Sequence, residues 1–149
     1  MTKFFTRLFV ALVAMISFSF VSCDYDKDDS ISYNLDGIWE GDIAVESIVT
    51  IHGQEKFSES KVRASFEFKQ HDYTAHGIGY ESYYVGSKCV ELQFSYQIEK
   101  EVIYLTYENG DQQKIRNYFL DSNGLVFSGW IVNLQTNESY QFSMVKVAK

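Results

Sequence analysis

Proline is absent from this sequence of 149 residues, which contains only two cysteines and nine glycines. Because proline removes a backbone donor from a sheet, its absence is compatible with long, uninterrupted strands. If Cys23 is modified, Cys89 is the only remaining thiol and no internal disulfide can form. The domain must then be stabilised by its own hydrophobic core, in which we expect Cys89 to be packed as a small apolar residue.

The sequence patterns of common catalytic and cofactor sites are also missing. There is no Gly-x-Ser-x-Gly and no glycine-rich phosphate loop, and the spacings of His52, His71 and His76 match no zinc motif. Glu99 and Glu101 form a carboxylate pair, but they fall in an expected turn, where they lack the burial that acid–base catalysis requires. We therefore predict a protein that is not an enzyme and has no cofactor and no metal site.

Basic residues are outnumbered by acidic ones. The chain has 13 Lys and Arg against 20 Asp and Glu, and removal of residues 1–22 would take away two basic residues and no acidic one. The remaining 127 residues would carry a net charge of −9. Such a charge repels phosphate backbones and anionic lipid headgroups, so we expect no nucleic-acid partner.

Long hydrophobic runs are limited to one segment near the start of the chain. Lys3 and Arg7 precede an uncharged, largely apolar run of 13 residues at 8–20. This run is too short to cross a bilayer core, which needs about 20 residues, but it has the length of a cleaved signal. We therefore predict a signal peptide over residues 1–22.

The sequence Phe20-Val21-Ser22-Cys23 resembles the lipobox of bacterial lipoproteins, in the looser form found in the Bacteroidota. In that family the cysteine thiol receives diacylglycerol, and acidic residues just after it, as at 24–29, act as a surface-export signal. The resemblance implies that the lipid on Cys23 anchors the protein in the outer membrane, facing the cell surface or the periplasm. The alternative is an ordinary secretory signal with an unrelated cysteine near its cut site.

Residues 23–34 are polar and acidic and show no apolar periodicity. We predict that they form a flexible tether between the anchor and a single domain at 35–149. Within the tether, Asp29-Ser30-Ile31 resembles the O-glycosylation motif of Bacteroidota envelope proteins, which makes Ser30 a candidate glycan site.

Apolar and polar residues alternate along most of the domain, for example over 62–69 and 90–99. A period of two indicates strands with one buried and one wet face. Turn signals such as Asn109-Gly110 separate the alternating segments. Seven such turns predict eight strands, at about 37–50, 56–69, 73–84, 88–98, 102–107, 113–120, 125–133 and 139–147.

Every connection between these strands is short, so sequence neighbours should pair antiparallel as an up-and-down meander. Eight strands leave two exposed edges unless the sheet closes on itself. We therefore predict an all-β fold with an eight-stranded closed barrel. An open curled sheet or a β-sandwich is the alternative.

The segment Leu35-Asp36-Gly37-Ile38-Trp39 resembles the Gly-x-Trp motif at the first strand of lipocalin-like (calycin) domains, and residues 140–146 resemble their last strand. In that family a basic side chain near the end of the domain packs over the first-strand tryptophan. Lys146 stands at this position, where Arg is usual.

Aromatic residues make up 17% of the chain. An eight-stranded barrel is either filled by its side chains or holds one small ligand, and both outcomes remain open. We predict that the barrel binds a small apolar or aromatic ligand, and the candidate lining residues are Trp39, Phe66, Phe68, Leu92, Phe94, Tyr96 and Tyr107.

A second hypothesis is a surface adaptor that recognises a glycan, another envelope protein or a host protein. It depends on Tyr80, Tyr83 and Tyr84, which cluster near the end of the third predicted strand. Exposed tyrosines are enriched at interfaces, so these three residues are the candidate surface patch.

Overall fold

The computed structural model describes residues 27–51, 54–121 and 123–148. The described chain contains one helix and eight strands, which are α2 (Lys27–Leu35), β1 (Gly37–Ile51), β2 (Gln54–Gln70), β3 (His76–Val85), β4 (Lys88–Glu99), β5 (Val102–Tyr107), β6 (Gln112–Leu120), β7 (Val126–Asn133) and β8 (Ser139–Ala148).

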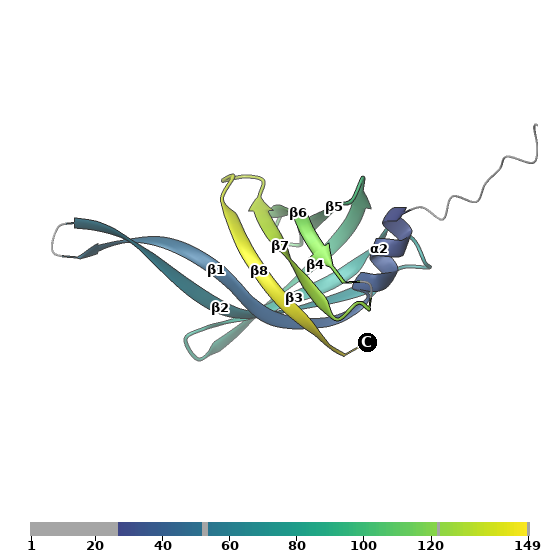
Figure 1. Cartoon of the computed structure of the whole chain (residues 1–149), viewed down its shortest axis with the longest axis horizontal. Coiled ribbons are helices and arrows are strands. Elements are labelled where there is room, and N and C mark those ends of the chain that lie inside the picture. Colours follow the sequence, from purple (N-terminus) through teal and green to yellow (C-terminus); the bar gives the residue numbers. More distant parts are fainter. Residues whose placement is uncertain (1–26, 52–53, 122, 149) are drawn as a thin grey trace, which may run out of the picture.

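The eight strands form a closed antiparallel barrel in which each strand pairs with its sequence neighbours and β1 pairs with β8 (Figure 1). This confirms the predicted eight-stranded up-and-down barrel over the open sheet and the sandwich. Tight turns connect neighbouring strands of the barrel. At the β4–β5 turn, for instance, Lys100 and Glu101 both adopt positive φ angles, which suit the twist of a hairpin.

The strand boundaries agree with the sequence prediction to within two residues except at the start of β3. This strand begins at His76, whereas the alternation predicts residue 73. Asp72 and Tyr73 have φ angles of 46° and 57°, so they belong to the turn that follows β2. Residues 73–75, which the alternation assigns to the strand, therefore belong to the turn.

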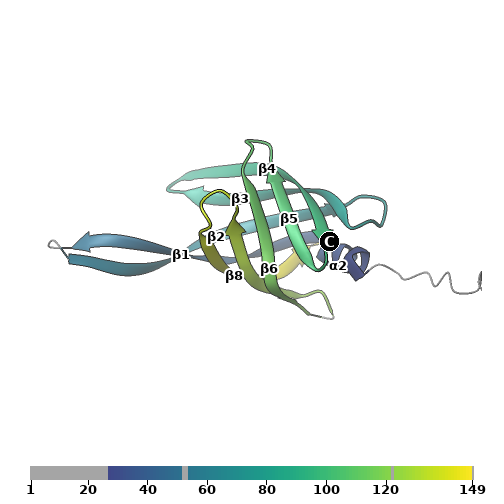
Figure 2. The ribbon, with the colours of Figure 1, turned by 90° about the horizontal axis from the view of Figure 1, so that it is seen from above.

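The β1–β2 hairpin is longer than the barrel. β1 pairs with β8 only as far as Ala44, and β2 pairs with β3 only from Ala64. The two strands continue to pair with each other up to Ile51 and Gln54. Figures 1 and 2 show that this two-stranded arm projects from the barrel.

Helix α2 closes one end of the barrel. The prediction of a flexible tether is therefore wrong from Lys27 onward, where the chain is helical. Residues 23–26 of the predicted tether lie outside the described chain. Ile31 and Leu35 are four residues apart and therefore share one face of the helix, and both pack on the barrel core. The acidic composition of this short segment hides that single apolar pair from a search for periodicity.

Polar contacts attach the helix to the β4–β5 turn and to the barrel interior. The carboxylate of Asp28 accepts hydrogen bonds of 2.9 Å from the backbone N–H groups of Lys100 and Glu101. Lys27 forms an ion pair with Glu101. The hydroxyls of Ser32 and Tyr96 share a buried hydrogen bond of 2.9 Å. The helix is thus fixed over this end of the barrel.

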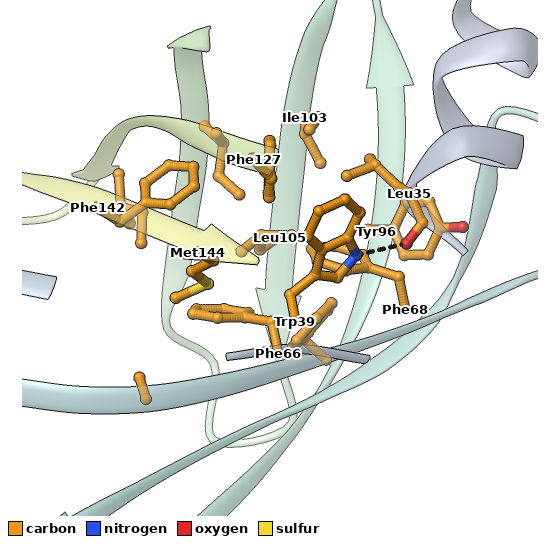
Figure 3. Close-up of a cluster of buried hydrophobic side chains, with 14 of the residues drawn as sticks. Leu35, Trp39, Phe66, Phe68, Tyr96, Ile103, Leu105, Phe127, Phe142 and Met144 are labelled. Carbon is orange, nitrogen blue, oxygen red and sulfur yellow. Dashed lines mark hydrogen bonds between the residues drawn. The ribbon is translucent and has the colours of Figure 1, made fainter. Parts of the chain in front are cut away.

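The buried hydrophobic core lies at the end of the barrel next to α2, and Figure 3 shows its side chains packed beside the helix. Trp39 is fully buried, and its indole N–H donates a 2.7 Å hydrogen bond to the carbonyl oxygen of Leu35. Lys146 Nζ lies 4.7 Å from the centroid of the Trp39 ring. The basic residue over the first-strand tryptophan is therefore present, with Lys in place of the usual Arg.

Candidate functional site

The end of the barrel opposite α2 contains a cavity of about 620 Å³. Its lining comes from the ends of strands and hairpins distant from the helix, including the β3–β4 hairpin at Gly86 and the β5–β6 turn at Asp111. A volume of this size lies within the range of small-molecule sites. The barrel is therefore filled in one half and hollow in the other.

The walls of the cavity are largely apolar. Strands β1, β2, β4 and β7 contribute the aliphatic lining residues Ile43, Val45, Val62, Leu92 and Ile131. Side chains alternate between the two faces of a strand, and these residues occupy inward positions. Such a wall favours the burial of an apolar ligand over water.

The deep part of the cavity contains a buried carboxyl group. Glu81 is only 8% exposed, and its Oε2 accepts a 2.6 Å hydrogen bond from the hydroxyl of Tyr107. Gln113 Oε1 lies 3.4 Å from the same hydroxyl. Tyr107 packs against Phe94 of the core, so this pair marks the boundary between the filled and the hollow half.

Burial dominates the electrostatics of this pair. Desolvation raises the pKa of the Glu81 carboxyl, and the hydrogen bond from Tyr107 opposes that rise in part. Burial and the adjacent Glu81 also raise the pKa of Tyr107. Tyr107 therefore keeps its proton and acts as a hydrogen-bond donor to Glu81.

Glu81 is a site residue that the sequence analysis missed. It lies between Phe66 of β2 and Leu92 of β4 in the sheet register, and both of these face inward. Cross-strand partners share a face, so Glu81 must also point into the barrel. The sequence could have indicated this, because a hairpin that turns at Gly86 pairs residue 81 with the inward residue 92.

Of the seven predicted ligand-lining residues, only Leu92 lines the cavity. The other six are buried in the core and do not face the cavity, namely Trp39, Phe66, Phe68, Phe94, Tyr96 and Tyr107. Alternation predicts which side of a strand a residue occupies, but it does not indicate its height along the barrel. Those six residues therefore lie closer to α2 than the cavity does.

The three predicted patch tyrosines do not share one surface. Tyr83 lines the cavity, whereas Tyr84 is 65% exposed at its rim. Tyr80 lies under Lys69, whose Nζ is 5.0 Å from its ring centroid. Residues 80 and 83 are an odd number of positions apart on one strand, so they point to opposite faces.

Three further sequence predictions involve single residues. Ser30 lies on α2 and is partly exposed, and its glycosylation stays a prediction. Cys23 lies outside the described residues. Cys89 is exposed, not packed in the core, because it pairs with Tyr84 close to the tip of the β3–β4 hairpin.

Within the described ranges, no three His, Cys, Asp or Glu side chains gather in a way that could hold a metal ion. Helix α2, with nine residues, is too short to cross a bilayer. No helix among the described residues is long and apolar enough to do so.

A family model for the lipocalin-like domain matches residues 35–127, which is more than half of the chain. The matched segment starts just before the Gly-x-Trp motif and ends within β7, so it includes the first-strand Trp39 and Glu81. Comparisons with curated proteins and with solved structures gave no match. With its closed eight-stranded barrel, this chain belongs to the lipocalin-like domain family.

Proposed function

We propose that this protein binds a small apolar or aromatic ligand in the open half of its barrel. The observation that carries this proposal is the cavity of about 620 Å³ with its aliphatic wall. A lipocalin-like barrel fits a small-ligand binding role, and a filled core on one side leaves the other half free for a guest.

We also propose that the role is binding and not catalysis. The described residues that line the cavity include no histidine, cysteine, serine or lysine. Ser–His and Cys–His pairs, in which a base activates the nucleophile, are therefore absent from the described lining. Glu81 instead contacts Tyr107, which holds it in place.

The cellular setting is a proposal that depends on the sequence. A lipid on the thiol of Cys23 would anchor the mature chain in the outer membrane, at the cell surface or facing the periplasm. Metabolic labelling with a fatty-acid probe tests this, since labelling should disappear in a Cys23→Ala variant. Labelling that persists in the variant would contradict the anchor.

Native mass spectrometry of residues 24–149, isolated from the cells that make the protein, tests ligand binding. We expect a mass excess that disappears on denaturation. A Leu92→Trp variant should lose this excess, because the larger side chain would occupy the cavity. The matched control is Glu91→Trp, at the exposed neighbouring position, which should retain it. A bare mass in the unmodified chain would contradict the proposal.

The rim of the cavity supports one alternative function. Tyr84 is exposed beside Val85 at the β3–β4 hairpin, so an aromatic and an aliphatic side chain are available to a partner there. A glycan or a protein of the envelope or the host could bind to these two residues. Loss of partner capture in a Tyr84→Ser variant that still carries its small ligand would favour this adaptor function.

A further inference from the structure

The charges that line the cavity are of one sign. Glu81 and Asp111 are acidic, and no lysine, arginine or histidine is found among the described lining residues. A cavity with low-dielectric walls and charges of one sign concentrates counter-ions of the opposite sign. An anionic ligand, such as a fatty acid, would meet repulsion here.

The Glu81 carboxyl retains hydrogen-bonding capacity. Tyr107 donates to Oε2, and the described residues supply no hydrogen bond to Oε1. Oε1 is not among the fully buried polar atoms without a partner, so it is open to the cavity, and a ligand donor there would add a charge-assisted hydrogen bond. Since Glu81 lines the cavity, a bound ligand can reach this group.

We propose that the ligand of this cavity is an amine with an apolar body, whose ammonium group donates to Glu81. The apolar body packs on the aliphatic wall formed by Ile43, Val62 and Leu92, and Asp111 adds a second negative charge at the β5–β6 turn. Tyr107 is a positioning residue, because it holds the Glu81 carboxylate from the core side. This inference rests on the proposed ligand-binding function and names the chemical class of the ligand.

Amine binding at Glu81 should depend on pH. Burial raises the pKa of Glu81, and acidification that protonates this carboxyl removes its attraction for an ammonium group. The other titratable groups that line the cavity are Tyr83 and Tyr84 on β3, Asp111 at the β5–β6 turn and Tyr140 on β8, with Tyr107 beneath Glu81. No described cation among them competes with the ligand.

The test compares ligands that share a body and differ in one group. The first series is tryptamine, tryptophol and indole-3-propionate, and the second is octylamine, octanol and octanoate. Isothermal titration of the chain 24–149 should show that each amine binds about tenfold or more tightly than its alcohol, and each acid most weakly. The amine preference should diminish on acidification, while the affinity for the alcohol stays constant.

Two variants show where the preference originates. Glu81→Gln keeps the side-chain volume and should abolish the amine preference without loss of alcohol binding. Glu91→Gln removes a charge of the same kind from an exposed position outside the cavity lining and should change neither. Circular dichroism verifies that both variants are folded.

The two proposals fail in different ways. Binding in which the alcohol or the acid equals or exceeds the amine overturns the amine inference and leaves the ligand-binding function intact. An amine preference that survives in Glu81→Gln overturns the role of Glu81. Absence of binding for all six compounds overturns the binding function and the inference together.

Discussion

Lys146 joins the end of helix α2 to the first-strand tryptophan. Its Nζ lies 4.7 Å from the Trp39 ring centroid and donates 2.8 Å hydrogen bonds to the carbonyl oxygens of Asn34 and Asp36. The last carbonyls of a helix have no partner within the helix, so a cation there satisfies them and interacts favourably with the helix dipole. One side chain near the C-terminus therefore fixes the segment that enters the barrel.

Replacement of Lys146 tests this link. Lys146→Met keeps the aliphatic stem and removes the charge, and we expect the free energy of unfolding to fall by about 1–3 kcal/mol. Lys146→Arg should retain most of the stability, because a guanidinium group also stacks on indole and donates to carbonyls. Urea denaturation measures both. An equal loss in the two variants would contradict a role for the charge.

The hydrogen bond between Ser32 and Tyr96 should couple α2 to β4. Ser32→Ala leaves the buried Tyr96 hydroxyl without this partner, so a loss of about 1–3 kcal/mol is expected. In Tyr96→Phe the same substitution at Ser32 should cost less. A double-mutant cycle gives the coupling energy, for which about 1 kcal/mol is expected. Additive effects would show that the bond contributes nothing.

Gly79 should tolerate no side chain. A Cβ there would clash with the backbone carbonyl oxygen of Glu67 on β2 and with the ring of Phe94, its cross-strand partner in the packed core. We expect Gly79→Ala to lower the free energy of unfolding by about 1–3 kcal/mol or more, because both the Phe94 ring and the backbone of β2 must shift. Ile78→Ala, at the neighbouring exposed position, is the control and should cost less. A neutral Gly79→Ala would refute the close packing of Phe94 on β3.

Glu81 should make stability depend on pH. The pKa of its carboxyl is raised in the folded protein from a value near 4.5 in the unfolded chain. Its contribution to the free energy of unfolding is therefore fully present below pH 4.5 and is lost as the pH rises through the raised pKa. Glu81→Gln removes this titration. Its stability relative to the unmodified protein should therefore increase with pH over that window, as followed by thermal denaturation at a series of pH values. Glu91→Gln should show no such trend.

Local patterns were sufficient to predict the strands and their closure. Alternation over 62–69 and 90–99 reports directly on which face of a strand is buried, and short turns force neighbours to pair. The contact between Lys146 and Trp39 was implied by the resemblance to lipocalin-like domains and not by local patterns, and it forms because β1 and β8 pair in the closed barrel.

The position of the cavity could not be derived in the same way. Phe94 and Leu92 are both inward residues of β4, yet one fills the core and the other lines the cavity. The difference depends on the height at which aromatic rings from other strands meet, as Phe66, Phe68 and Phe94 do near α2. Such packing is a property of the assembled barrel and not of one strand.

The position of α2 has a consequence for orientation at a membrane. If the thiol of Cys23 carries lipid, as proposed, the chain from there to Lys27 can span no more than about 14 Å. The helix closes the end of the barrel opposite the cavity, so that closed base would stand next to the bilayer. The entrance would then face away from the lipid, and ligands would arrive from the aqueous side. Exchange with a soluble donor would be direct, without extraction from the membrane.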